Sequence, residues 1–162
     1  MAILSKAYYE SPIGFIEITA NEKEIISIYF VDSANKNLNK NSSIIELCLN
    51  DLDEYFKGKI TRFSFPFNFS GTDFQNKVWN ELLNIPYGET ISYAELSGRI
   101  KNPLAIRAVG TANGRNPISI VVPCHRVIGS NNNLIGYGGG LWRKKWLLDH
   151  EKSVKYGLTT LF

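Results

Sequence analysis

The first thirty residues alternate short runs rich in β-branched and aromatic side chains with residues that favour turns. The runs cover residues 3–10, 15–20 and 25–31, and the segments Ser11-Pro12-Ile13-Gly14 and Asn21-Glu22-Lys23 separate them. Short strand-like runs divided by turn signals are typical of neighbouring strands joined by tight connections. The pattern therefore predicts a three-stranded antiparallel meander at the start of the chain.

A polar loop and one helix are expected after the meander. Residues 32–42 are rich in Asn, Lys and Ser, which favours an exposed loop. Ser43-Ile44-Ile45-Glu46 has the form of a capping box, in which the Ser and the Glu satisfy free main-chain donors at a helix start. This helix should extend to about Lys57 and end at Gly58. In residues 61–69, phenylalanines alternate with other residues, which predicts a strand or an extended linker.

Helical spacing replaces strand-like spacing in the second part of the chain. Thr72-Asp73-Phe74-Gln75 is a further helix start, and apolar residues recur at helical spacing up to Ile85, where Pro86-Tyr87-Gly88 ends the pattern. We therefore expect an N-terminal α/β supporting domain over residues 1–70 and a mainly helical domain over residues 71–162. The predicted fold class is α+β, a small antiparallel sheet with one helix followed by helices.

Two short helices joined by a tight turn are predicted inside the helical domain. Ser92-Tyr93-Ala94-Glu95 is a third capping box, and its helix should end near Ile100. Asn102-Pro103 supplies an N-cap and a first-turn proline for a second helix over residues 104–113, which Gly114 should end. This is the pattern of a helix-turn-helix, a common DNA-binding motif. Helical hairpins also serve as plain packing units, so the pattern alone leaves both interpretations open.

The second of these helices has an unusual surface. Ala108, Gly110 and Ala112 are small, and Arg107 is the one long cation beside them. Small side chains let a helix approach a neighbouring helix closely, which is one explanation. The other is a shallow fit against the minor groove of DNA, with Arg107 inserted into the duplex.

Charge is distributed unevenly along the chain. Residues 1–70 hold 7 Lys and Arg against 9 Asp and Glu, whereas residues 71–162 hold 11 against 6, so the net charges are −2 and +5. No acidic residue occurs between Glu95 and Asp149, although eight cations do. These are Arg99, Lys101, Arg107, Arg115, Arg126, Arg143, Lys144 and Lys145. A solvated basic face or a surface for a polyanion would each explain such a run.

Composition narrows the class of protein. The 162 residues are 44% hydrophobic and 20% charged, as in ordinary globular proteins. No apolar run approaches the roughly 20 residues of a membrane span, and no secretory signal begins the chain, so we expect a cytoplasmic protein without a membrane partner. Two cysteines and two histidines lack the number and spacing of a disulfide framework or a zinc site. We therefore expect neither a bridge nor a metal.

One of the two cysteines lies next to a histidine, in Pro123-Cys124-His125-Arg126-Val127. A thiol becomes a nucleophile as its thiolate, and a neighbouring base or cation is expected to lower its pKa for that purpose. Most lone cysteines are instead small core residues, and Cys48, within an apolar run, fits that description. Cys124 follows the apolar run of residues 118–122, which Pro123 ends. On these two residues alone, catalysis and structure are both open.

Four motifs together resemble the O6-alkylguanine-DNA alkyltransferase family. They are Pro123-Cys124-His125-Arg126-Val127, Arg107-Ala108-Val109-Gly110 with Asn116-Pro117, Ser92-Tyr93, and Tyr137-Gly138-Gly139-Gly140-Leu141. The resemblance covers roughly residues 72–151. It implies DNA repair by irreversible, stoichiometric transfer of an alkyl group from O6 of guanine in double-stranded DNA to the protein's own cysteine. The nucleotide must rotate out of the stack for this chemistry. O4-alkylthymine is a second lesion that the resemblance leaves open.

The resemblance implies five catalytic residues. Cys124 would accept the alkyl group, His125 would take the thiol proton through a water, and Glu151 would orient the imidazole, as in a triad. Asn116 would hold the active-site loop, although a plain turn-forming Asn before a proline explains it nearly as well. Tyr93 would displace a phosphate and donate its hydroxyl to the purine.

The resemblance also implies DNA contacts and a base pocket. The expected DNA-contacting residues are Arg107, Tyr93, Ala94, Asn102, Ala108, Gly110 and Ser130, and Arg107 would fill the space that the nucleotide leaves. The expected pocket residues are Val127, Tyr137, Gly138 and Gly139, with the carbonyls of Cys124 and Val127 accepting from the guanine amino group. Some relatives carry Ser at the position of Gly138, and zinc-binding relatives use residues with no counterpart here. No metal and no cofactor are expected.

Two other functions compete with alkyl transfer. A sensor that binds alkylated DNA without chemistry would keep the fold, but such relatives replace the cysteine that Cys124 supplies. A thiol hydrolase would take its nucleophile and base from separated parts of the chain, whereas Cys124 and His125 are adjacent. We therefore expect an alkyltransferase that acts as a monomer in solution.

Overall fold

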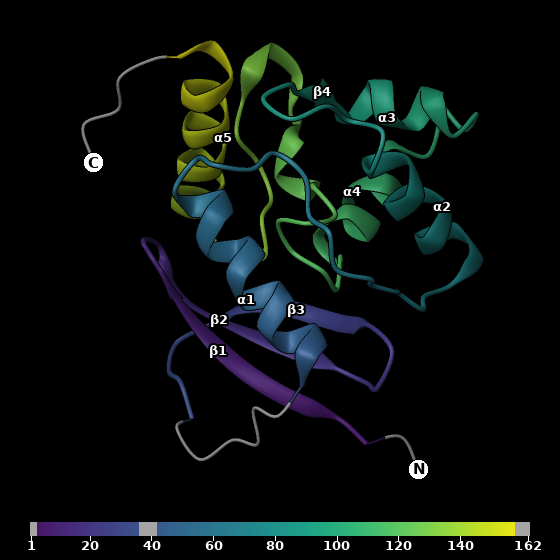
Figure 1. The fold of residues 1–162 in the computed structure, drawn as a ribbon. Coiled ribbons are helices and arrows are strands. Elements are labelled where there is room, and N and C mark those ends of the chain that lie inside the picture. Colours follow the sequence, from purple (N-terminus) through teal and green to yellow (C-terminus); the bar gives the residue numbers. More distant parts are fainter. Residues whose placement is uncertain (1–2, 36–41, 158–162) are drawn as a thin grey trace. The chain divides into compact units, whose positions relative to one another are not determined.

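The structure is a computed structural model that describes residues 3–35 and 42–157 (Figure 1). It divides into two compact units, one of Met1–Phe69 with Pro117–Val121, the other of Ser70–Asn116 with Val122–Phe162. Within the predicted loop over residues 32–42, residues 32–35 have no regular structure, and residues 36–41 lie outside the described residues. The predicted α+β class is confirmed, since a small sheet precedes a mainly helical part.

The first unit contains the expected meander. Strands β1 (Ser5–Ser11), β2 (Gly14–Ala20) and β3 (Ile25–Val31) pair antiparallel in that order. The turn between β1 and β2 closes through Ser11, whose hydroxyl donates to the Gly14 carbonyl at 2.7 Å. Gly14 adopts a φ of 111°, which explains why a glycine occupies this turn.

Helix α1 (Ser43–Phe56) packs against the sheet and buries residues such as Ile45 and Leu52 (Figure 1). Its N-cap is Ser42, whose hydroxyl accepts from the main-chain N of Ile45 at 3.2 Å. The capping box predicted from Ser43 was therefore wrong by one residue, because the preceding Ser also has a side chain able to cap. The predicted end is confirmed, since the helix stops before Lys57 and Gly58 takes a φ of 74°.

The apolar segments outside the meander contribute single bridges to it rather than strands. Residues 61–69 contain bends and no strand, and Phe67 forms a single bridge to Ile25. Ile118 bridges to Ile28, with the Ile28 N–H donating to Pro117 O at 2.9 Å and the Ser119 N–H donating to Ile28 O at 3.0 Å. The run of residues 118–122 thus belongs to turns and not to a strand of its own.

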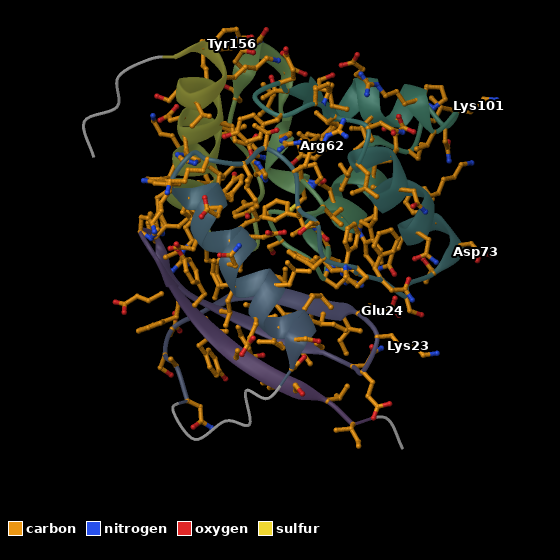
Figure 2. The ribbon with its side chains drawn as sticks, viewed as in Figure 1. Lys23, Glu24, Arg62, Asp73, Lys101 and Tyr156 are labelled. Atoms are coloured by element: carbon orange, nitrogen blue, oxygen red, sulfur yellow. The ribbon has the colours of Figure 1, made fainter. Side chains whose placement is uncertain are left out.

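The second unit begins with helix α2 (Asp73–Leu82). The capping box predicted here is confirmed, because Thr72 and Gln75 each accept from the other's main-chain N–H, at 3.1 and 3.0 Å. Asp73 lies at the start of this helix (Figure 2). Further along, the Trp79 indole donates to the main-chain O of Ala112 at 2.8 Å, and this bond ties α2 to the helix α4 (Ile106–Gly114).

Helices α3 (Tyr93–Arg99) and α4 form the expected pair of short helices. Ser92 caps α3 by accepting from the main-chain N of Glu95 at 3.0 Å, as predicted. The predicted start of α4 was wrong, because Ala105 is its N-cap and no side chain caps it. Asn102 instead closes the connecting turn, where its carbonyl accepts from the Ala105 N–H at 3.0 Å. Lys101 lies at the outer end of this turn (Figure 2).

A short parallel pair and one long helix complete this unit. Strands β4 (Ile91–Ser92) and β5 (Val127–Ile128) pair in parallel. Helix α5 (Leu141–Tyr156) contains Glu151. Its C-cap is Gly157, in the left-handed conformation.

Candidate active site and nucleic-acid interface

Cys124 and His125 lie in a single 3₁₀ turn, Cys124–Arg126, which leads directly into β5. The Arg126 N–H donates to Pro123 O at 3.0 Å and closes the turn. The Asn116 side chain donates to Val122 O at 2.7 Å, so it holds the segment just before the cysteine. The cysteine therefore sits in a turn that is fixed on both sides.

The Glu151 carboxylate, on α5, forms hydrogen bonds with His125, Arg126 and Gly88. The His125 Nε2 atom lies 2.7 Å from its Oε2, and Arg126 donates from Nε at 2.7 Å and from Nη2 at 3.1 Å. The main-chain N–H of Gly88 also donates to it, at 3.3 Å. The structure thus brings together His125 and Glu151, which are 26 residues apart in sequence.

These contacts determine the protonation of the pair. Burial alone would raise the pKa of Glu151, but His125 and Arg126 together lower it well below its usual range. Burial lowers the pKa of His125, although Glu151 opposes that shift. A neutral imidazole must then carry its proton on Nε2, toward the carboxylate, so its Nδ1 is left as an acceptor. Nδ1 is buried and has no hydrogen-bond partner among the described residues.

The thiol of Cys124 is nearly sealed, with 5% of the residue exposed. Burial raises its pKa, while the Asn116 amide, the Lys144 cation and main-chain N–H groups act in the opposite direction. The pKa lowered by a neighbouring base, expected from the sequence, is therefore not found, because desolvation exceeds these contributions. The raised pKa favours the protonated thiol in the free protein, so the thiol needs a base to become a nucleophile.

Lys144 is a residue of this site that the sequence analysis missed. It is fully buried, and its Nζ donates to the carbonyls of Ile135 at 2.9 Å and Gly136 at 3.4 Å. Burial lowers its pKa to about 8. Helical spacing could have revealed it, since Lys144 shares a face of α5 with the buried Leu147 and Glu151.

Arg126 was also misjudged, because the sequence analysis counted it in the basic run. Its side chain is 9% exposed and is bound on two sides. One side meets Glu151, and Nη1 donates to Ile85 O at 2.7 Å. The guanidinium also lies over the ring of Tyr87, 5.5 Å from its centroid. This cation serves the buried site and not the surface.

A cavity of about 520 Å³ opens between α3, α4 and the loop after β5. Its lining residues are Tyr93, Ala94, Ile106, Arg107, Gly110, Thr111, Gly129, Ser130, Ile135 and Gly136. Helices α3 and α4 and the loop after β5 thus each contribute residues to this one cavity. Its size suits a small organic group such as a nucleobase.

Most of the residues expected to contact DNA meet at this cavity. Tyr93, Ala94, Arg107, Gly110 and Ser130 line it, whereas Asn102 and Ala108 are exposed outside its lining. The expected pocket residues do not line it: Val127 is fully buried, Tyr137 and Gly139 are half-buried, and Gly138 is exposed. Ile106 and Thr111, which also line the cavity, were not expected at the site.

Tyr93 connects the cavity with the buried thiol. Its hydroxyl donates to the main-chain O of Ile135 at 3.1 Å, and the Nζ of Lys144 lies 5.6 Å from its ring centroid. Burial raises the pKa of Tyr93, a nearby Asn113 amide opposes this, and the Cys124 sulfur adds to it. The tyrosine that lines the cavity therefore lies within electrostatic reach of the cysteine.

The basic run divides into buried, paired and free cations. Arg99 pairs with Glu95 at 3.3 Å, and Lys145 pairs with Asp149 at 2.6 Å. Lys101, Arg107 and Arg115 are exposed and form no ion pair with any described residue. Arg107 lies on α4 and lines the cavity, Lys101 lies in the turn between α3 and α4, and Arg115 is the C-cap of α4.

Residues 3–35 and 42–157 contain neither a candidate metal site nor a candidate membrane-spanning helix. Within them, no group of three or more His, Cys, Asp or Glu side chains could hold a metal ion. No helix in the same ranges has the length and apolar character required to cross a membrane.

Sequence comparison assigns both parts of the chain to one family. Residues 73–153 match the DNA binding domain of 6-O-methylguanine DNA methyltransferase, and residues 4–69 match its ribonuclease-like domain. A methylated-DNA--protein-cysteine methyltransferase of Mycobacterium leprae is 45% identical over 158 residues, covering 94% of this chain and 95% of the relative. One from Methanosarcina acetivorans is 43% identical over 152 residues, covering 91% and 97%.

Solved structures give the same assignment. The crystal structure of Mycobacterium tuberculosis O6-methylguanine methyltransferase superimposes with a TM-score of 0.84 at 41% identity, covering 93% of this chain and 94% of that one. The Mycobacterium tuberculosis OGT in complex with DNA gives 0.83 at 42% identity, covering 91% and 92%.

Proposed function

Because this chain belongs to the O6-methylguanine DNA methyltransferase family, we propose that Cys124 removes the alkyl group from O6-alkylguanine in double-stranded DNA in one irreversible step. The protein is a DNA-binding alkyltransferase of DNA repair. The proposal concerns the residues that perform the transfer and the lesion they act on. One observation supports it most strongly: His125, the residue after Cys124, is hydrogen-bonded to Glu151 through Nε2, and its Nδ1 is buried with no hydrogen-bond partner among the described residues.

The transfer is a displacement at the alkyl carbon. The Cys124 sulfur forms a bond to that carbon while the bond from carbon to O6 breaks, and the electron pair of the broken bond remains on the purine. The thiol proton passes to Nδ1 of His125 through a water, and the purine takes up a proton to leave as guanine. The thioether is stable, so each molecule acts once.

Each neighbouring group has a role in that displacement. Glu151 fixes the imidazole tautomer and stabilises the imidazolium as it forms, and Arg126 keeps Glu151 ionised. Lys144 and the Asn116 amide favour the thiolate. Tyr93 supplies the hydroxyl that protonates or hydrogen-bonds the departing purine. The relay is assembled before DNA arrives, because its hydrogen bonds exist in the free protein.

The cavity between the two short helices would receive the extruded nucleotide. Arg107 would fill the space left in the duplex, and the exposed Lys101 and Arg115 would face the phosphates. Extrusion costs a few kcal/mol, which contacts of this kind offset. The loop that carries Ser130 would contact the backbone at the cavity's rim.

Specificity for the base would rest on main-chain groups. The carbonyls of Cys124 and Val127 would accept from the guanine amino group. Tyr137, Gly138 and Gly139, which lie outside the lining of the cavity, would border the base from the loop that precedes α5. A Cβ at Gly138 would make only ordinary contact, 3.6 Å from Gly114 O, so packing does not forbid a side chain there.

We propose that the protein acts as a cytoplasmic monomer without metal or cofactor. All members of the relay and the lining of the cavity come from one chain. The positive charge beside the sulfur comes from Lys144, so the chemistry requires no ion. Residues 1–70 would support the active domain. A sensor without chemistry is not favoured, because the nucleophile and its base are both present.

The test is the loss of the methyl group from DNA with wild-type protein and with Cys124→Ser. A duplex that carries a single O6-methylguanine should lose the methyl group in proportion to wild-type protein. Cys124→Ser should bind the same duplex with similar affinity and leave the lesion intact. Cys48→Ser is the matched control, since Cys48 is buried in α1, and it should repair DNA like the wild type. Repair by Cys124→Ser would refute the assignment.

A further inference from the structure

The hydroxyl of Tyr93 already has a hydrogen-bond acceptor in the free protein. It donates to the main-chain O of Ile135 at 3.1 Å. The Lys144 Nζ atom donates to the same oxygen at 2.9 Å and to Gly136 O at 3.4 Å. A carbonyl oxygen has two lone pairs, so these two donors satisfy that of Ile135. In the proposed function the departing purine needs the same hydroxyl, so the bond to Ile135 has to break first.

The Ile135 carbonyl lies near the end of an exposed loop, residues 130–136. The residues of this loop are exposed or half-buried, and its start is closed by the Gly129 N–H, which donates to Asn133 O at 2.7 Å. A segment that buries few side chains opens at a low free-energy cost. The bonds from Tyr93 and Lys144 to the end of the loop therefore contribute much to holding it in place.

The same loop forms part of the wall between the cavity and the nucleophile. Ser130, Ile135 and Gly136 line the cavity, whereas Cys124 is not among the described residues that line it and is only 5% exposed. Both donors to the Ile135 carbonyl, Tyr93 and Lys144, also lie within electrostatic reach of the Cys124 sulfur. A base in the cavity therefore cannot touch the sulfur until this part of the wall moves.

We propose that the hydrogen bond from Tyr93 to Ile135 is a latch that closes Cys124 to small electrophiles and opens for a base that accepts the Tyr93 hydroxyl. This inference rests on the proposed function, in which that hydroxyl serves the purine. A purine offers ring nitrogens and O6 as acceptors in place of the Ile135 carbonyl. A small alkylating agent offers no such replacement, so it leaves the latch closed. Tyr93 thereby determines which class of electrophile reaches the sulfur.

The test compares two reactions of the same sulfur. One is alkylation of Cys124 by iodoacetamide without DNA, in which the sulfur displaces iodide, and the other is methyl transfer from a duplex with O6-methylguanine. Tyr93→Phe keeps the ring and removes the hydroxyl. It should speed the reaction with iodoacetamide roughly fivefold, the effect of one hydrogen bond. It should slow methyl transfer about tenfold or more, because the purine loses its donor. Peptide mapping over time measures both rates.

Two further readouts distinguish an open latch from other effects of Tyr93→Phe. The gain in the iodoacetamide reaction should be the same factor at every pH, because the latch changes how often the sulfur is exposed and not its ionisation once exposed. Cys48 gives an internal reference in the same peptide map, since it is fully buried in α1. Its reaction with iodoacetamide should be equally slow in both proteins.

Ser97→Ala is the matched control. Ser97 is fully buried in α3, the helix that begins at Tyr93, and its hydroxyl has no hydrogen-bond partner among the described residues. Loss of this hydroxyl should leave both reactions of Cys124 at their wild-type rates. An equal gain in the iodoacetamide reaction with Ser97→Ala and with Tyr93→Phe would show general loosening of the helix and would overturn the latch.

The other outcomes separate this inference from its premise. If Tyr93→Phe slows methyl transfer but leaves the iodoacetamide reaction unchanged, Tyr93 acts on the purine alone and no latch exists. A gain that varies with pH would show an effect on the ionisation of the thiol and would also overturn the latch. Absence of methyl transfer by the wild type would instead refute the proposed function, whatever the result with iodoacetamide.

Discussion

The sulfur of Cys124 is subject to opposing effects whose balance sets when it can react. Burial keeps it protonated, and the Lys144 cation and the Asn116 amide reduce the cost of ionising it. A buried thiol is protected from oxidants and other electrophiles, because the thiolate is the reactive form. His125 supplies the base at the moment of transfer. The residue is thus stable at rest and reactive only with a substrate in the cavity.

Lys144→Met should slow methyl transfer roughly tenfold at pH 7, because removal of the cation raises the pKa of the Cys124 thiol further. The pH profile of the single-turnover rate should move to higher pH. The difference from the wild type should shrink above about pH 8, where Lys144 itself loses its proton. Methyl transfer from duplex DNA across a range of pH measures both effects.

Lys145→Met is the control for this substitution, since the neighbouring Lys145 is exposed and pairs with Asp149. It should leave the rate and the profile unchanged. A uniform fall of the Lys144→Met rate at every pH would contradict the electrostatic role. Lys144 would then act only by holding the carbonyls of Ile135 and Gly136.

At the scale of secondary-structure elements, helix α4 links the surface of the unit with the active site. Its exposed residues include Arg107, and its buried residues include Asn113, which reaches the Cys124 carbonyl. Trp79 of α2 binds the carbonyl of Ala112 and thereby fixes the same end of α4. A contact made by this helix with DNA is therefore made at a fixed position relative to the nucleophile.

Arg107→Ala should slow repair of O6-methylguanine in duplex DNA about tenfold or more, and should change transfer from free O6-benzylguanine little. The free base needs no extrusion from a duplex, so it needs no side chain to fill the vacated space. Arg115→Ala is the control, because Arg115 is another exposed cation without an ion pair among the described residues. It should weaken DNA binding without this difference between substrates. Equal slowing on both substrates by Arg107→Ala would exclude the role.

Local sequence signals predicted which helices and strands form better than they predicted the residues at which these elements begin. The caps at Thr72 and Ser92 were correct, since the side chain and its main-chain partner are three residues apart. Asn102 was taken for a cap and closes a turn instead, because Asn followed by Pro serves both structures equally well. The bridge of Ile118 to Ile28 joins residues too far apart in sequence for any local pattern to show.

The candidate site could be predicted in part. Cys124 and His125 were evident from their adjacency, and Glu151 came from the family resemblance. Arg126 and Lys144 were counted as surface cations because sequence alone does not show that a basic residue is buried against a carboxylate or a carbonyl. Burial also reversed the expected direction of the Cys124 pKa, since desolvation depends on the packing of the whole unit.

At the scale of the whole molecule, the buried relay makes stability depend on pH. The folded-state pKa values of His125 and Glu151 both lie below their unfolded values. Their contribution is fully present above the unfolded pKa of His, about 6.5, and is lost as pH falls. The loss should steepen below about pH 4.3, where unfolded Glu takes up protons. The free energy of unfolding in urea, measured at several pH values, should therefore fall from pH 7 to pH 5.

His125→Asn provides the comparison for that experiment. The variant has no imidazole to titrate, so its free energy of unfolding should change less between pH 7 and pH 5 than that of the wild type. An identical decline in both proteins would mean that other groups cause the acid sensitivity.

The chain carries a net charge of −2 over residues 1–70 and +5 over residues 71–162, so the positive charge lies in the part that holds the cavity and the relay.

The measurement that tests the whole account most directly is the intact mass and peptide map of the protein after reaction with excess duplex carrying one O6-methylguanine. We expect every molecule to gain a single methylene, on the peptide with Cys124, and to repair no more than one equivalent of DNA. A methyl group on another residue, repair beyond one equivalent, or unmodified protein bound to the lesion would contradict it.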